Sequence, residues 1–236
     1  MGELIGAVAV LLVGSGLVWL LSRLGREKPS ATVPQILTEA EISAEPDGPL
    51  PFGYKTAWLA VRCEDPREVA DALKCQCREK ANWQSGLLRS METRGDLFCS
   101  PVLDGFVLMI GQGLFALTER QDELEKLAGR FPEVQYFASY RVSSCYCWAR
   151  YADGVCVRAY GVEDGKVSWD IGPLTPEETA LGFDRFPCAG WEDSWEDSCE
   201  DFPDEEDVLD IAAAWGVDPR FEKTTCPPSV GWLCAL

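Results

Sequence analysis

The chain has 236 residues and no histidine, and its 39 acidic residues outnumber 21 basic ones, giving a net charge of -18. The missing imidazole removes the usual general base, the usual activator of a Ser or Cys nucleophile and the commonest transition-metal ligand. The excess of acid argues against binding to nucleic-acid phosphate or to anionic lipid headgroups, since both need clustered Lys and Arg.

An apolar run opens the chain, from Leu4 to Leu21, with Ser15 as its one interruption. Eighteen helical residues cover about 27 Å, close to the roughly 30 Å hydrocarbon core of a bilayer. A cleaved secretory signal would begin with positive charge, whereas here Glu3 precedes the run and the basic residues follow it. We therefore predict a transmembrane anchor over residues 1–28, marked by Leu4, Leu11, Leu12, Trp19, Leu21, Arg23 and Arg26.

The basic residues after the run set the orientation. Arg23, Arg26 and Lys28 are expected to stay in the cytoplasm, which leaves a very short N-terminus outside. Eleven cysteines, an odd number, agree with reduced thiols on the cytoplasmic side. A cleaved signal, a buried core helix and N-terminal lipidation are the alternatives.

Residues 29–51 differ in composition from the rest of the chain. They contain five prolines, four acids and no basic residue, and we expect a linker of about 27 Å average span. Residues 52–236 are enough to bury one substantial core, and the chain as a whole has nine tryptophans. We expect residues 52–236 to form one cytoplasmic domain.

Six elements are expected between residues 56 and 140. In chain order they are a strand at 56–62, a helix begun by Asp65 and Pro66, strands at 97–103 and 106–110, a helix at 119–130 and a strand at 134–140. Asp104-Gly105 between the two middle strands is typical of a type I′ hairpin turn. This order predicts an α+β fold with a ferredoxin-like βαββαβ core: a four-stranded antiparallel sheet with two helices on one face.

An antiparallel β-meander is expected to extend this core. Strands at 145–151, 155–160 and 167–171 are separated by Asp153-Gly154 and Asp164-Gly165, which have the same turn chemistry. Two helices then follow. Thr175 begins one with a capping box, and the other starts after Asp204 and ends at Gly216.

Two Cys-x-Cys pairs raise the question of a structural metal site. They are Cys75 with Cys77 and Cys145 with Cys147. Zinc knuckles usually have Cys-x-x-Cys spacing, whereas Cys-x-Cys on a strand places both sulfurs on one face. Core packing is the preferred interpretation, a Cys-rich metal site stays as an alternative, and no cofactor is expected.

The most unusual segment, residues 191–207, has ten acids and no base, with Trp-Glu-Asp-Ser repeated in tandem. A solvated loop that caps the next helix explains the charge without function. The functional hypothesis is a surface for a basic protein, with aromatic anchors among carboxylates. Its residues are Trp191, Glu192, Asp193, Trp195, Glu196, Asp197 and Phe202. Residues 83–87, Trp-Gln-Ser-Gly-Leu, are a second candidate recognition loop.

Three stretches of sequence resemble a family of bacterial proteins. They are residues 100–108, residues 133–137 with 148–150 and 157–160, and residues 202–208 with 214–219. No activity, cofactor or catalytic residue is established for that family, so the resemblance implies a bacterial source alone. With the predicted anchor, it places the chain in the bacterial inner membrane as a single-pass protein.

Two classes of function follow from these patterns. The preferred one is a membrane-anchored, acidic, non-enzymatic protein-binding module facing the cytoplasm, of the immunity or inhibitor type or an assembly partner. Its expected partners are a basic protein and the membrane, with no nucleic acid. The alternative is a histidine-independent enzyme that uses Cys99, Asp104 or Asp170, and a pocket that holds one of these beside Arg94, Arg141 or Arg158 would favour it.

Overall fold

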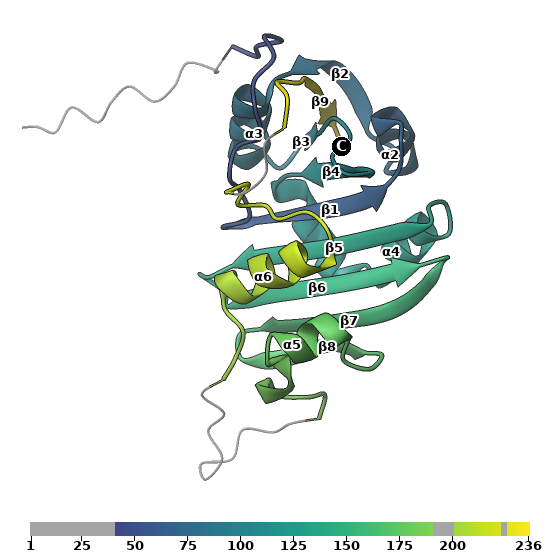
Figure 1. The fold of residues 1–236 in the computed structure, drawn as a ribbon, viewed down its shortest axis with the longest axis vertical. Helices are drawn as coiled ribbons and strands as arrows, with labels where there is room; N and C mark the ends of the chain where they lie inside the picture. Colours follow the sequence, from purple (N-terminus) through teal and green to yellow (C-terminus); the bar gives the residue numbers. More distant parts are fainter. Residues whose placement is uncertain (1–40, 191–200, 223–225) are drawn as a thin grey trace, which may run out of the picture. The chain divides into compact units, whose positions relative to one another are not determined.

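Strand β1 (Thr56–Arg62) lies at the centre of the fold in the computed structural model, which describes residues 41–190, 201–222 and 226–236 (Figure 1). Six of its seven residues are buried. Ala57 and Leu59 belong to one apolar cluster, and Trp58 and Ala60 belong to another. Since successive side chains of a strand point to opposite faces, β1 separates two cores.

The described strands form one nine-stranded sheet, in the order β2-β9-β3-β4-β1-β5-β6-β7-β8. Every paired neighbour in this sheet is antiparallel. The other strands are β2 (Gln76–Ala81), β3 (Asp96–Cys99), β4 (Phe106–Ile110), β5 (Glu133–Tyr140), β6 (Cys145–Ala152), β7 (Val155–Glu163), β8 (Lys166–Ile171) and β9 (Gly231–Ala235). The α+β class predicted from the sequence is confirmed.

One face of the sheet carries the cluster that we call the cysteine-rich core. Cys75, Cys99, Cys145, Cys147 and Cys234 belong to it. Helices α2 (Pro66–Ala72) and α4 (Gln121–Ala128) and the 3-10 helix η1 (Gln112–Glu119) cover it with their buried side chains. The predicted helix at 119–130 is therefore shorter than expected, and η1 precedes it.

The opposite face carries the aromatic core, which includes Trp58, Trp83, Trp148 and Trp215. Helices α3 (Trp83–Glu92) and α6 (Glu205–Trp215) and the 3-10 helix η2 (Phe183–Arg185) contribute to it, and α5 (Pro176–Ala180) precedes η2. In Figure 1, α5 and α6 lie in front of strands β5 to β8, whereas α4 lies behind them.

Local signals in the sequence are confirmed where they fix backbone conformation. The three Asp-Gly pairs have positive φ at both residues, as a type I′ turn needs: 50° and 82° at Asp104 and Gly105, for example. Asp65 caps α2, and capping boxes begin α5 at Thr175 and α6 at Asp204. Cys145 and Cys147 share one face of β6, as predicted.

Four elements differ from the expectations of the sequence analysis. Residues 83–87 were expected as a recognition loop, but they form the start of α3, and Trp83 is fully buried. Strands β2 and β9 were not predicted. The strand expected at 97–103 stops as β3 at Cys99, because Pro101 has no N–H to continue the ladder.

Part of the segment expected as linker contacts the domain. Both carboxylate oxygens of Asp47 accept hydrogen bonds at the start of α3, from the backbone N–H of Trp83 (2.7 Å) and of Gln84 (3.0 Å). The backbone of Asp47 also forms an isolated antiparallel β-bridge with that of Ser229, and the carbonyl of Ser43 accepts a hydrogen bond from the N–H of Asn82. An anion is stabilised at a helix N-terminus, so this segment helps to hold α3 on the sheet.

We expect Gly86→Ala to destabilise the domain, although Ala is normally the better helix former by roughly 1 kcal/mol. A Cβ at this position would overlap the ring of Phe98 in the aromatic core. The resulting overpacking should lower the free energy of unfolding by about 1–3 kcal/mol, measured by urea denaturation. At Gly95 an added Cβ meets nothing within 4 Å, so Gly95→Ala is the matched control. Equal stability of the two variants would contradict the packing of α3.

Candidate functional site

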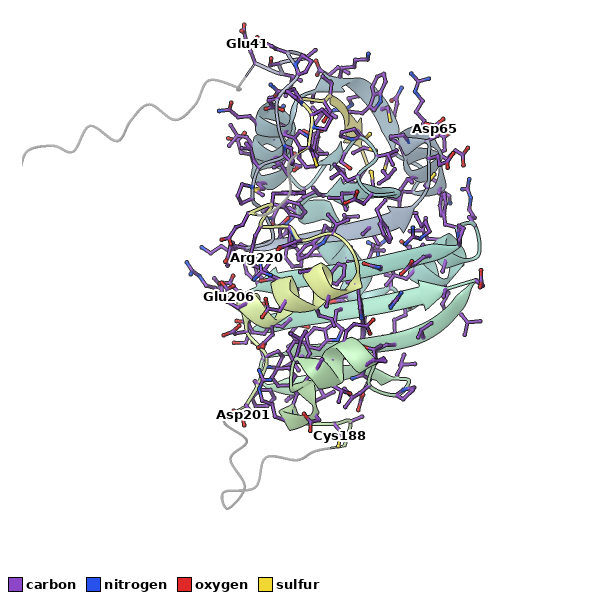
Figure 2. The ribbon with its side chains drawn as sticks, viewed as in Figure 1. Glu41, Asp65, Cys188, Asp201, Glu206 and Arg220 are labelled. Atoms are coloured by element: carbon purple, nitrogen blue, oxygen red, sulfur yellow. The ribbon has the colours of Figure 1, made fainter. Side chains whose placement is uncertain are left out.

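The segment expected to bind a partner falls largely outside the described residues. Trp191, Glu192, Asp193, Trp195, Glu196 and Asp197 are not described, whereas Phe202 is. The side chain of Phe202 is partly buried and packs against the aromatic core. The flanking residues Gly190 and Asp201 are both exposed, and Asp201 is labelled at the same end of the picture as Cys188 in Figure 2.

The carboxylates at the start of α6 serve the helix and its docking. Asp204 accepts from the N–H groups of Glu206 (2.8 Å) and Asp207 (3.2 Å), and Asp207 accepts in return from the N–H of Asp204. Arg185 of η2 donates to Asp207 (2.9 Å). Burial raises the pKa of the Asp207 carboxyl, although these donors oppose the shift. These acids therefore act as caps and ion-pair partners.

Arg220 joins α6 to the chain that follows it. Its guanidinium donates to Asp210 (2.8 Å) and Asp218 (2.9 Å) and lies 3.8 Å from Glu206 (Figure 2). Glu206 in turn accepts from the hydroxyl of Tyr54 (2.6 Å), and this hydrogen bond raises the pKa of Tyr54 to about 12. Arg141 lies 3.9 Å from Glu205. Arg220 and Arg141 are thus already engaged by acids of α6, as Arg185 is.

A buried ion-pair network holds α5 on the last two strands of the sheet. Arg158 of β7 donates through Nε to both oxygens of Glu178 (2.9 and 3.2 Å) and through Nη1 to Asp170 (2.7 Å). Glu178 has no exposed surface, and it also accepts from Trp148 Nε1 (2.8 Å) and from the N–H of Thr175 (2.8 Å). A carboxylate buried so deeply is stable because four donated hydrogen bonds compensate its lost hydration.

Asp170 fulfils one condition of the enzyme hypothesis, since it lies beside Arg158 at a cavity of about 190 Å³. Leu174, Phe183 and Phe186 also line this cavity. Burial alone would raise the pKa of Asp170, but the hydrogen bonds from Arg158 and from the N–H of Ala189 hold it below its usual range. A carboxylate with a lowered pKa is a weak proton acceptor at neutral pH.

The other candidate catalytic groups are placed differently. Cys99 has no exposed surface, and its thiol donates to the carbonyl of Pro66. Asp104 occupies the hairpin turn between β3 and β4. Arg94 lines a cavity of about 490 Å³ with Tyr140, and neither Cys99 nor Asp104 lines it. Of the catalytic candidates and arginines that the sequence analysis named, the described structure brings together Asp170 and Arg158.

Four cysteines from neighbouring strands approach one another. Cys75 immediately precedes β2, Cys77 lies on β2, Cys99 ends β3 and Cys234 lies on β9. Burial raises the pKa of the Cys75 and Cys77 thiols to about 12. In the described part of the chain, no three His, Cys, Asp or Glu side chains are arranged to hold a metal ion.

A second polar cluster, absent from the sequence analysis, lies between the sheet and α6. Glu133 accepts from Arg62 (3.1 Å), Arg150 (2.9 Å) and Gln135 (2.9 Å), and the amide of Gln135 also donates to the carbonyl of Trp215 (3.1 Å). Neither this cluster nor the Arg158–Glu178 pair has a local sequence signal. The alternation of side chains between the two faces of β5 and β7 could at most have shown that some of their polar residues fall at buried positions.

None of the helices in the described ranges is long and apolar enough to cross a bilayer. The predicted anchor at residues 1–28 lies outside those ranges, so it stays a prediction.

Comparison of the chain with protein families, with curated proteins and with solved structures found no match. The resemblance to a bacterial family therefore also stays a prediction.

We expect Glu178→Gln to lower the free energy of unfolding by about 3 kcal/mol, because it leaves Arg158 buried with one anion fewer. Urea denaturation checks this value. The adjacent Glu177→Gln is the control, since Glu177 is partly exposed and lies 3.9 Å from Arg150, so its loss should cost less than about 1 kcal/mol. A similar decrease in the free energy of unfolding in the two variants would contradict a stabilising role of the buried Arg158–Glu178 pair.

Asp170→Asn should destabilise the protein at pH 7, and the loss of stability should become smaller as the pH falls below 3.8. A carboxyl whose pKa is lower in the folded state adds stability above its unfolded pKa, here near 3.8, and that contribution is lost as the pH falls through the folded value. Urea denaturation at pH 7, 4 and 3 measures the difference between wild type and variant. A difference that stays constant over this range would contradict the assigned pKa shift.

Proposed function

We propose that this chain is a membrane-anchored, non-enzymatic protein-binding module, in which the acidic segment at residues 191–207 contacts a basic protein on the cytoplasmic side. The binding surface includes Trp191, Trp195 and Phe202 as aromatic anchors and Glu192, Asp193, Glu196 and Asp197 as acids. An immunity or inhibitor protein and an assembly partner are the two roles of this kind that we propose.

The distribution of arginine supports this proposal. Six acids lie between residues 192 and 201, with no basic residue in that stretch. Arg185, Arg141 and Arg220 are the arginines that pair with the acids of α6. Carboxylates that have no basic residue in their own stretch and stand next to aromatic residues in sequence favour a cationic partner, whose approach they would also accelerate.

We also propose that a ferredoxin-like βαββαβ core underlies the domain. The order β3-β4-β1-β5 at the centre of the sheet supports it, as does the packing of α2 and α4 in the same core. In this interpretation β2 and α3 are an insertion in the first crossover, and β6 to β8 are the meander extension.

The anchor and the location complete the proposal. Residues 1–28 would span the bacterial inner membrane once, with Arg23 and Arg26 on the cytoplasmic side. The high net negative charge would keep the domain away from anionic headgroups.

A second candidate function is a histidine-independent enzyme with Asp170 as its acidic group. The observation that favours it is the Asp170–Arg158 pair beside a small cavity. The guanidinium of Arg158, however, also donates to Glu178 and to two backbone carbonyls, which leaves it little capacity for a substrate.

Neutralising the acidic segment should abolish partner capture without affecting the fold. In full-length protein, Glu192, Glu196, Asp193 and Asp197 are changed together to Gln and Asn. The variant is then used for affinity capture from detergent-solubilised native membranes, with quantification by mass spectrometry. It should recover at least tenfold less of a basic protein than wild type does. Loss of the same protein at high salt is expected, because screening weakens exposed charge pairs.

The matched control removes four acids from an exposed surface elsewhere. Glu119, Asp122, Glu123 and Glu125 lie on or beside α4, and their isosteric neutral variants change the net charge equally. This control should keep the captured protein. Equal capture by wild type, the segment variant and the control would overturn the proposal.

A further inference from the structure

Two thiols on neighbouring strands face each other at unusually short range. Cys77 of β2 and Cys234 of β9 are directly opposite in the antiparallel pairing, and their sulfur atoms are 3.0 Å apart. A disulfide bond has a length of about 2.05 Å, so roughly 1 Å of approach would join them.

The two thiols differ in access to solvent. Cys77 is partly buried and lines an open cavity of about 600 Å³ together with Cys75, Arg67, Lys74 and Trp232. Cys234 has no exposed surface and lies in the cysteine-rich core. A small reagent that enters the cavity therefore meets Cys77 before Cys234.

Charged and aromatic side chains line the cavity beside Cys77. The Arg67 guanidinium lies over the Trp232 ring at 4.9 Å from its centroid, and the Lys80 ammonium lies 5.8 Å from the same centroid. Lys74 and Asp71 line the cavity as well; the charge of Asp71 raises the pKa of Cys77, whereas that of Arg67 lowers it. The cavity lining thus includes two cations, Arg67 and Lys74, and one acid, Asp71.

We propose that Cys77 and Cys234 are a redox-sensitive pair that forms a cross-strand disulfide on exposure to a peroxide or to a low-molecular-weight disulfide. With hydrogen peroxide, the Cys77 sulfur attacks one oxygen, the O–O bond breaks, and water and a sulfenic acid form. The Cys234 sulfur then attacks the Cys77 sulfur, so the S–S bond forms, the S–O bond breaks and a second water leaves with the Cys234 proton. With a low-molecular-weight disulfide, the two successive exchanges release two thiols.

The reaction should be slow at neutral pH. Burial and the hydrogen bond to Cys234 raise the pKa of Cys77 to about 12, and the thiolate is the reactive form. As long as the pH is below that pKa, the thiolate fraction, and with it the oxidation rate, should increase about tenfold for each unit by which the pH is raised. The disulfide between Cys77 and Cys234 would therefore form under sustained oxidation and act as a structural cross-link, and not as a rapidly cycling redox site.

The bond would fix the edge of the sheet. Strand β2 is the outermost strand on its side, and five of its six residues are at least partly exposed. The two cysteines are 157 positions apart, and a cross-link that closes a long loop restricts the unfolded chain strongly. Oxidation should raise the melting temperature by about 5 °C or more.

The test uses full-length protein treated with hydrogen peroxide or with oxidised glutathione at pH 7 and pH 9. Non-reducing tandem mass spectrometry should locate a Cys77–Cys234 bond that forms faster at pH 9 and disappears with dithiothreitol. Cys77→Ser should abolish the bond and the gain in melting temperature. Cys75→Ser is the matched control, because it removes a buried thiol two residues away and should keep both.

Other linkages would overturn the proposal. A bond from Cys234 to Cys75 or Cys99, or bonds between molecules alone, would show that the observed approach does not direct oxidation. Circular dichroism establishes whether Cys77→Ser folds; if it does not, the mapped linkage in wild type decides by itself. No Cys77–Cys234 bond after complete reaction of the exposed Cys188 would also overturn it.

Discussion

Burial of β1 on both faces is the constraint on which the rest of the structure depends. A strand with water on one side needs one core, whereas this strand needs apolar partners on two sides. Helices α2 and α4 satisfy one side, and α3 and α6 satisfy the other. The elements that complete the second side come from residues 83–92 and 205–215, so the fold requires contacts between distant parts of the chain.

The two cores differ in chemistry, and this difference decides where polar groups can be buried. The aromatic core has large rings in edge and stacked contacts, such as Trp58 on Phe137 at 5.1 Å. Its margin holds the Glu178–Arg158 pair, where the indole N–H of Trp148 supplies a donor. The cysteine-rich core holds five buried thiols among its aliphatic and aromatic side chains, and thiols need no such donors, so Cys77 and Cys234 can approach closely.

Sequence patterns predicted the elements whose signals are local. Asp104-Gly105 and the capping boxes at Thr175 and Asp204 fix the backbone within four residues, so their chemistry is visible without the fold. Strand β2 has no such signal, because Arg78, Glu79 and Lys80 are exposed on an edge strand and its ladder is completed by β9, far along the chain. The ion pairs of Arg158 were invisible for the same reason. Their partners, Asp170 and Glu178, become neighbours of Arg158 only when β7, β8 and α5 assemble.

The pairing of charges also limits where a partner could bind. Three of the four acids at the start of α6, namely Glu205, Glu206 and Asp207, pair with Arg141, Arg220 and Arg185, so a basic ligand would have to displace an existing ion pair to use them. Displacement returns one guanidinium to water for every new pair and gains little energy, since exposed ion pairs are worth at most about 1 kcal/mol each. The acids between residues 192 and 201 have no base in their own stretch. Recognition that uses the charge of this chain should therefore depend on that stretch more than on the start of α6.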